Sequence, residues 1–355
     1  MVKKDKIIHI ELLRILAIFF VIFNHTGERG FFLFADELDS PFFPLYIFLS
    51  IACKVAVPIF YMISGALLLD REETIKKVYF NRIFYYIITL IVVSFIYWRW
   101  GATLPISKMT LKVFGVKLYS YRLSTQLWYL YSYLGVLVML PLLRRFVISM
   151  RNKDFIYLLV CHVLFVGIIP IIRYYFSKGA LNSNDYFSIP IITSSCVFYG
   201  LIGYYVERSI DIKKINKKIL FVGLLVSMIF IIISSYMTMY KAGIVGALNE
   251  DVSQSFHSCL ISVPTITLYL ACKYYCINYS IPQIFQRVII SIGSTTFGIF
   301  LLEKMLRTYL NYIYVDLEPV VGALPACFLW VVMCVLIGFC ITYLLKKVPI
   351  IKKFI

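Results

Sequence analysis

An apolar segment at residues 7–25, which reads IIHIELLRILAIFFVIFNH, carries two residues whose types and spacing could do chemistry together. Arg14 is in its interior, and His25 ends it eleven residues later. At about 3.6 residues per turn and 1.5 Å per residue, a helix places both side chains on one face, roughly 16 Å apart. Guanidinium suits phosphate, and imidazole is a general base near neutral pH. The spacing therefore predicts an anion clamp and a proton acceptor half a membrane apart.

Each residue also has a structural interpretation. A cation inside a membrane costs about 2.5–3.5 kcal/mol on insertion scales and is a functional-site hypothesis by default. Arg14 could instead form an ion pair with Glu11, three residues earlier on the same face. His25 could be an interfacial histidine that is hydrogen-bonded to its neighbours.

A carboxylate, Glu303, lies near the end of a late apolar segment, at about the predicted depth of His25. A carboxylate there could hold the tautomer of the imidazole and stabilise its charged form. Glu303 could instead pair with Lys304 or Arg307, the latter at the favourable i+4 spacing. Glu28, just after His25, is the alternative carboxylate and a candidate substrate-binding residue.

The second apolar segment holds candidate donor-binding residues. Lys54 is a second cation inside the membrane, and Pro58 breaks the helix and frees a carbonyl. Ser64 and Gly65 allow close helix contact or the approach of a ligand to the backbone.

A basic loop follows at Arg71, Lys76, Lys77 and Arg82. These residues either follow the ordinary positive-inside rule for cytoplasmic loops or form the mouth of a site for an anionic cofactor.

The fourth apolar segment opens with aromatic residues. Trp128 and Tyr129 fall where an aromatic belt is expected, and the deeper Tyr131 and Tyr133 could supply hydroxyl groups. Trp128 and Tyr131 are therefore candidate substrate-binding residues, with the belt as the structural alternative.

The composition excludes an ordinary soluble domain. Of the 355 residues 61% are hydrophobic and only 15% are charged, and apolar runs of about twenty residues recur. The formal charge of +17 would suggest nucleic acid in a soluble protein, but here the cations sit in short loops, so nucleic acid is not expected as a partner. The first segment contains Glu11 and Arg14 and is followed by no small-residue cleavage site, so it is not read as a cleaved signal peptide.

The predicted fold is an all-α polytopic membrane bundle of about ten helices, forming a single domain over residues 1–355. Lys and Arg number 22 in the connections on one side and 11 on the other, which predicts that both termini are cytoplasmic and that His25 lies near the outer face. The predicted spans are 7–25, 45–69, 82–98, 126–144, 155–176, 188–206, 219–240, 258–277, 287–306 and 322–345.

The outer segment 99–125 departs from the charge trend because it carries five of the eleven outer cations. It is either an interfacial segment that lies on lipid headgroups or a basic patch for an anionic glycan or lipid phosphate.

The nine cysteines are interpreted as small apolar core residues, so neither disulfides nor a metal is implied. His162, in the middle of an apolar segment, reads as a satisfied core histidine.

The sequence resembles the acyltransferase-3 family of membrane O-acyltransferases. The resemblance rests on Arg14 and His25, which match the family's Arg-ten-residues-His motif. It continues through VPIFYMISGALLL (57–69), LWYLYSYLGVLVMLPLL (127–143) and STTFGIFLLE (294–303). Four blocks in order cover nearly the whole chain.

The resemblance implies a bundle of roughly ten spans that moves an acyl group, usually acetyl, from cytoplasmic acyl-CoA to a hydroxyl on the outer side. It implies that His25 is catalytic and that Arg14 serves the donor. Coenzyme A is multiply anionic and cannot enter lipid, so its phosphates would stop at an inner basic mouth while the pantetheine arm reaches His25. General-base attack and a transient acyl-imidazole both remain open.

Two departures from the family pattern matter. Tyr85 replaces a second basic residue three positions after Arg82, and Glu303 stands where many members have histidine. The function that the resemblance implies is O-acetylation of a surface polysaccharide or lipid-linked sugar in a bacterial cell membrane, with acetyl-CoA as the donor and membrane lipids as surroundings.

Two other functions compete with this interpretation. One is a polysaccharide or lipid-linked glycan exporter with the same fold, which should show polar residues along several spans and internal repeats. The other is a non-catalytic scaffold, which would not need to keep Arg14 and His25.

Overall fold

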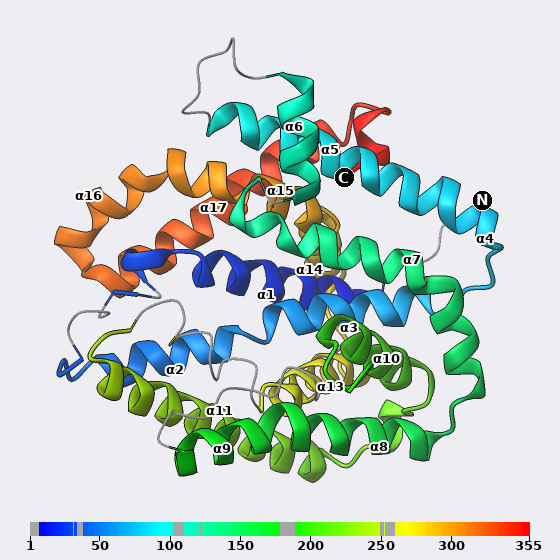
Figure 1. Cartoon of the computed structure of the whole chain (residues 1–355), viewed down its shortest axis with the longest axis horizontal. Coiled ribbons are helices and arrows are strands. Elements are labelled where there is room, and N and C mark those ends of the chain that lie inside the picture. Colours follow the sequence, from blue (N-terminus) through cyan, green and yellow to red (C-terminus); the bar gives the residue numbers. More distant parts are fainter. Residues whose placement is uncertain are drawn as a thin grey trace. The chain divides into compact units, whose positions relative to one another are not determined.

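The computed structural model describes residues 7–30, 32–33, 38–101, 110–120, 123–177, 189–248, 252 and 260–355. All regular structure in these ranges is helical, and Figure 1 shows the helices in chain order. The prediction of an all-α polytopic membrane protein is confirmed.

Each of the ten predicted apolar segments overlaps one to three consecutive helical elements. Among the described residues, the α-helices α6 (Leu111–Ser120) and α16 (Asn311–Val321) lie between these segments. The ten are α1 (Ile8–Asn24); α2 (Phe43–Cys53) with α3 (Ala56–Leu68); α4 (Ile75–Val78), η2 (Tyr79–Ile83) and α5 (Phe84–Trp100); α7 (Trp128–Ser149); α8 (Asn152–His162), η5 (Val163–Ile168) and α9 (Ile169–Ser177); α10 (Ser195–Arg208); α11 (Lys217–Val245); α13 (Ser262–Asn278); α14 (Gln283–Gly293) with α15 (Thr296–Tyr309); and α17 (Ala323–Leu345).

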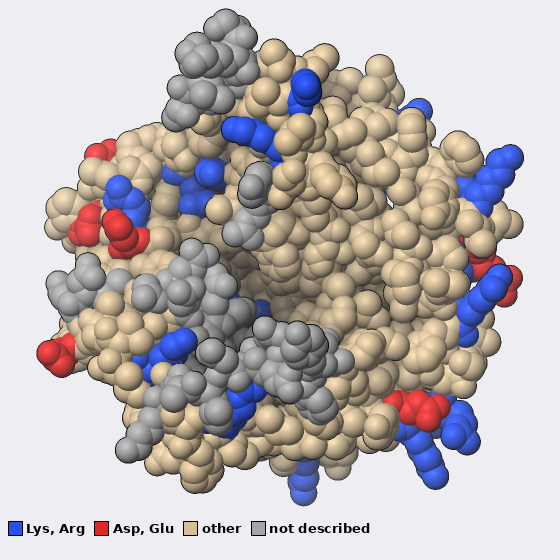
Figure 2. All heavy atoms as spheres, in the orientation of Figure 1, with Lys and Arg blue, Asp and Glu red and all other residues tan. Residues whose placement is uncertain are grey.

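Six continuous helical stretches among the described residues are long and apolar enough to cross a membrane. The pair α14 and α15, bent by 60° at its break, is a seventh candidate. Large apolar side chains such as Phe80, Leu142 and Phe221 remain exposed along these helices, and most of the described surface in Figure 2 carries no charge. Acyl chains suit such a surface and water does not. The count of ten spans and their orientation remain predictions.

The chain forms two compact units. Unit 1 comprises residues 1–67 and 150–339, and unit 2 comprises residues 68–149 and 340–355. The prediction of a single domain over residues 1–355 stays a prediction.

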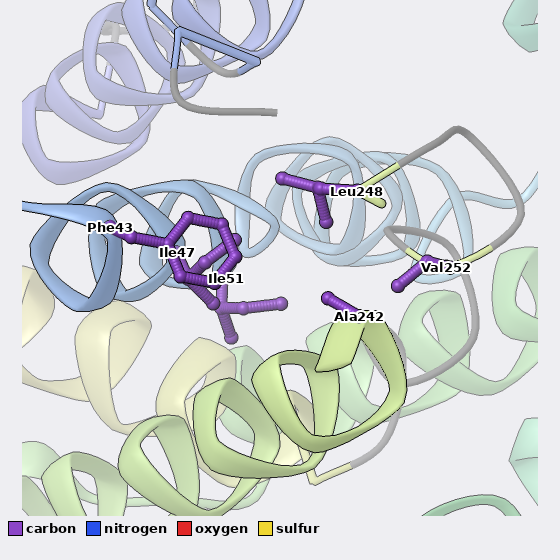
Figure 3. Packing of buried hydrophobic residues seen from close by; sticks show 6 residues of the cluster. All are labelled: Phe43, Ile47, Ile51, Ala242, Leu248 and Val252. Atoms are coloured by element: carbon purple, nitrogen blue, oxygen red, sulfur yellow. The ribbon is translucent and has the colours of Figure 1, made fainter. Parts of the chain in front are cut away.

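Unit 1 is built around α1, which packs against α2, α13, α14 and α15. A second contact joins α2 to α11. There Phe43, Ile47 and Ile51 meet Ala242 in a fully apolar cluster with Leu248 and Val252 (Figure 3). The cluster fixes α2 against α11 in unit 1.

Helices α3 and α10 approach each other closely because glycines face the contact. A Cβ atom on Gly65 would lie 1.8 Å from the carbonyl oxygen of Gly200, and one on Gly203 would lie 2.0 Å from that of Met62. No side chain fits at either position, so the helices pack backbone to backbone. The expectation of close helix contact at Ser64–Gly65 is met.

The break in the second span lies earlier than the sequence suggested. Helix α2 ends at Cys53 and α3 begins at Ala56, whereas Pro58 sits in the first turn of α3. Proline has no N–H to donate to the carbonyl four residues earlier, that of Lys54. The helix therefore breaks at Lys54 and restarts where proline is tolerated.

In unit 2, α7 packs against α4, η2 and α5. Helix α6 lies in the predicted interfacial segment 99–125, of which residues 102–109 and 121–122 are outside the described residues. Its Phe114 packs on Phe95 and Trp98, while Leu111, Val116 and Tyr119 stay exposed. The two predicted roles of this segment, contact with lipid headgroups or binding of an anion, stay predictions.

We predict that Gly65→Ala destabilises unit 1, because the new methyl group must push α10 away, an effect of about 1–3 kcal/mol. Gly135→Ala in α7 is the matched control, since nothing lies within 4 Å of its added Cβ. Thermal unfolding of purified protein in detergent should show a lower midpoint for Gly65→Ala alone. Equal midpoints for the two variants would show that the close contact is absent.

Candidate functional site

His25 is the residue that ends α1, and its side chain is about one third exposed. Nδ1 of its ring is buried and lies 3.2 Å from Oε1 of Glu303 on α15. The side chain of Glu303 is fully buried, with 0% exposure. A buried carboxylate thus meets one nitrogen of the imidazole, and the exposed part of the ring is left for a ligand.

Arg307 completes the pairing of Glu303. Its Nε donates to Oε2 of Glu303 at 2.7 Å, and its Nη1 donates to the backbone carbonyl of His25. The sequence offered His25, Lys304 or Arg307 as the partner of Glu303, and the structure brings His25 and Arg307 to it. Because Arg307 neutralises the carboxylate and also holds the end of α1, it stabilises the approach of His25 to Glu303.

A pocket of about 310 Å³ lies next to this pair. It is lined by Thr26, Arg29, Arg307, Thr308, Asn311 and Trp330. Its volume is at the small end of the range for ligand sites. Arg14 does not line it.

Arg14 lies on α1, eleven residues before His25, and its Nη1 donates to Oε1 of Glu11 at 2.9 Å. Glu11 is nearly fully buried, and Gly293 of α14 packs directly over it. The predicted ion pair with Glu11 therefore forms. Arg14 keeps 28% of its side chain exposed, so the pair does not exclude a second, anionic partner.

Arg82 belongs to unit 2, where it shares Glu73 with Arg144. Arg82 donates through Nε and Nη2 to Glu73 at 2.9 and 2.8 Å, and Nη2 of Arg144 donates to Glu73 at 2.8 Å. Arg144 Nε also caps the carbonyl of Leu68. Arg82 lies in the π-helical turn η2, an irregularity that is common at functional sites.

The cluster carries more positive than negative charge. Arg71, Arg82 and Arg144 surround the single carboxylate of Glu73. Arg71 Nε and Arg144 Nη1 are buried and have no hydrogen-bond partner in the structure. The hydrogen bond from Arg82 is the main cause that lowers the pKa of Glu73 from 4.5 to about 2.

The other predicted donor residues lie in unit 1. Lys54 is the C-cap of α2, at the break before α3. The hydroxyl of Ser64 donates to the carbonyl of Phe60 in its own helix at 2.8 Å. Each side chain thus has a structural setting, and their predicted roles in donor binding remain untested.

The predicted acceptor residues are divided between the units. Glu28 is exposed in a short turn after α1, and Glu303 rather than Glu28 reaches His25. Trp128 is 40% exposed at the start of α7 in unit 2. Tyr131 donates its hydroxyl to the carbonyl of Leu118 at 2.9 Å, so it joins α7 to α6. Their substrate contacts remain predictions.

The sequence profile of a family described as an acyltransferase domain matches residues 7–345. The chain belongs to the acyltransferase-3 family. The protein is therefore a multi-pass membrane acyltransferase in general terms. No curated protein and no solved structure matches the chain.

The sequence does not predict a buried network of hydrogen bonds and ion pairs at the start of α1. His9 Nε2 lies 2.6 Å from Glu207, the hydroxyl of Tyr269 donates to Glu207 at 2.9 Å, and Lys273 Nζ lies 3.2 Å from its second oxygen. Three ionisable residues at the edges of apolar segments were the available signal. His162 is as expected: it bonds the carbonyl of Ile192 at 2.6 Å and stacks on Phe198.

We predict that Glu73 makes the acyltransferase sensitive to acid. Its pKa is lower in the folded state, so its contribution to stability is present above pH 4.5 and is lost as the pH falls toward about 2. The difference in thermal midpoint between the wild type and Glu73→Gln should shrink across that window. A difference that stays constant from pH 5 to pH 2.5 would contradict the pairing.

Proposed function

We propose that this acyltransferase moves an acetyl group from cytoplasmic acetyl-CoA to a hydroxyl of an extracytoplasmic polysaccharide or lipid-linked glycan in a bacterial cell membrane. The observation that carries the proposal is the 3.2 Å pair of His25 and the fully buried Glu303, next to a polar pocket. A general base needs an orienting partner and access to a substrate: Glu303 is the partner, and the side chain of His25 stays 31% exposed beside a pocket that its neighbours Thr26 and Arg307 line.

His25 acts through Nε2. Glu303 faces Nδ1 and favours the tautomer that carries a proton there, which leaves the lone pair of Nε2 for the acceptor. Nε2 takes the proton of the acceptor hydroxyl as its oxygen bonds to the thioester carbonyl carbon. The C–S bond then breaks, and the proton passes to the sulfur of coenzyme A. A transient acyl-imidazole would use the same nitrogen.

Arg14 serves the donor from the other part of α1. A helix of this length separates the two positions by roughly 16 Å, which suits an extended pantetheine arm. Arg14 keeps an exposed part while Glu11 holds it in place. The Glu73 cluster, with its excess of guanidinium groups and two unpartnered buried N–H donors, is a second candidate contact for phosphate.

The direct test of the function is incubation of purified protein with labelled acetyl-CoA and candidate glycans. We expect turnover by the wild type and a loss of about 10²–10⁴-fold for His25→Ala in protein that still folds. Normal transfer by His25→Ala would overturn the assignment. Glycan movement into vesicles without turnover would favour the exporter.

The role of Arg14 is separated from its ion pair by two variants. We expect Arg14→Gln to raise the KM for acetyl-CoA by about tenfold or more, because a charge-assisted contact contributes roughly 1.5–3 kcal/mol. Glu11→Gln breaks the same pair but keeps the cation, and it should leave the KM near that of the wild type. An equal rise in both variants would show that the pair is structural only.

A further inference from the structure

Four of the six side chains that line the pocket beside His25 carry N–H donors. Arg29 and Arg307 contribute guanidinium groups, Asn311 an amide, and Trp330 an indole N–H. The hydroxyls of Thr26 and Thr308 already donate to backbone carbonyls of their own segments. A lining that is rich in donors and cationic groups fits a ligand rich in acceptors, and above all an oxyanion.

Arg29 supplies the unbalanced charge of this pocket. Arg307 is neutralised by Glu303, whereas no ion pair joins Arg29 to a carboxylate in the described part of the chain. Its guanidinium lies 4.8 Å from the centre of the Tyr314 ring. Tyr314 is itself buried and is held by a 2.8 Å hydrogen bond to Glu318. The aromatic contact positions Arg29 without satisfying its N–H groups, so a cation remains ready for an anionic partner.

Trp330 gives an independent indication of a ligand. Only 3% of the residue is exposed, and its Nε1 is buried without a hydrogen-bond partner in the structure. A buried donor left unpaired is destabilising, so such groups are rare unless a ligand or water completes them. Trp330 also lines the pocket, so a ligand oxygen that reaches Nε1 would complete this bond.

The position of the pocket connects it to the reaction. Arg307 is at once a lining residue, the partner of Glu303 and a donor to the carbonyl of His25. A group bound in the pocket would therefore touch Arg307 and Thr26, the one bonded to the carbonyl of His25 and the other next to it in sequence. Acyl-CoA is expected to bind on the Arg14 side, so the pocket is available to bind the acyl acceptor.

We propose that this pocket binds an oxyanion of the acyl acceptor, a carboxylate or phosphate carried close to the hydroxyl that becomes acylated. The proposal rests on the proposed function and specifies its substrate class as an anionic glycan. Arg29 and Trp330 are the residues that recognise the anion, and Arg307 contributes while it positions His25.

The test measures binding by the full-length protein in nanodiscs with matched probes. Methyl β-D-glucuronoside is compared with methyl β-D-glucoside, and glycerol 1-phosphate with glycerol. We expect the anionic member of at least one pair to bind about tenfold or more tightly than its neutral partner. A preference within the first pair assigns a carboxylate, a preference within the second assigns a phosphate, and a preference within both shows that the site reads charge.

Three variants identify the source of the preference. Arg29→Gln should abolish it, and Trp330→Phe, which keeps the aromatic ring, should weaken the anionic probe several-fold. Lys304→Gln removes a cation on α15 that does not line the pocket, and it should keep the preference. The proposal is overturned if the wild type prefers neither anion, if Arg29→Gln keeps the preference, or if Lys304→Gln loses it equally.

This test does not depend on catalysis. The binding measurement contains no acyl donor, so it can succeed even if His25→Ala transfers acetyl normally and the proposed function fails. Conversely, turnover with a neutral glycan together with an absent anion preference would refute the substrate class and leave the acyltransferase function standing.

Discussion

The structure depends on how an apolar bundle accommodates the fully buried carboxylate of Glu303. A lone carboxylate there would carry a desolvation penalty of several kcal/mol, so it needs compensating partners. Arg307 supplies the charge and binds the end of α1, and His25 occupies the remaining oxygen. The pairing that makes the buried charge tolerable also fixes the imidazole, so stability and the proposed chemistry depend on one contact.

Helix α1 carries a polar group at each stage of its length. His9 joins a buried network with Glu207 and Lys273 at its start, Arg14 pairs with Glu11 one turn further on, and His25 ends it. Its packing against α2, α13, α14 and α15 holds these groups in a fixed order. A donor that cannot enter lipid could thus be bound at one level and used at another, without a separate carrier of acetyl groups.

The sequence predicted the helices well because twenty-residue apolar runs and loop charges are local signals. It also predicted the Arg14–Glu11 and Arg307–Glu303 pairs, whose members lie three and four residues apart, and it offered His25 as a partner of Glu303 from their predicted depth alone. It did not predict the partners of His9 or of Glu73, since Glu207 and Arg144 are 198 and 71 residues away from them. Nearly uniform apolarity hides which helix face meets which neighbour, and Pro58 indicated the break in the second span only to within one turn.

The most direct test is to determine which nitrogen of the His25 ring carries the proton, by solid-state NMR of ¹⁵N-histidine-labelled protein in lipid. Only four histidines occur in the chain, so His25→Gln identifies the signal. We predict that neutral His25 carries its proton on Nδ1, facing Glu303, and that Glu303→Gln abolishes this preference. A proton on Nε2 in the wild type, or a signal that is indifferent to Glu303→Gln, would contradict the account.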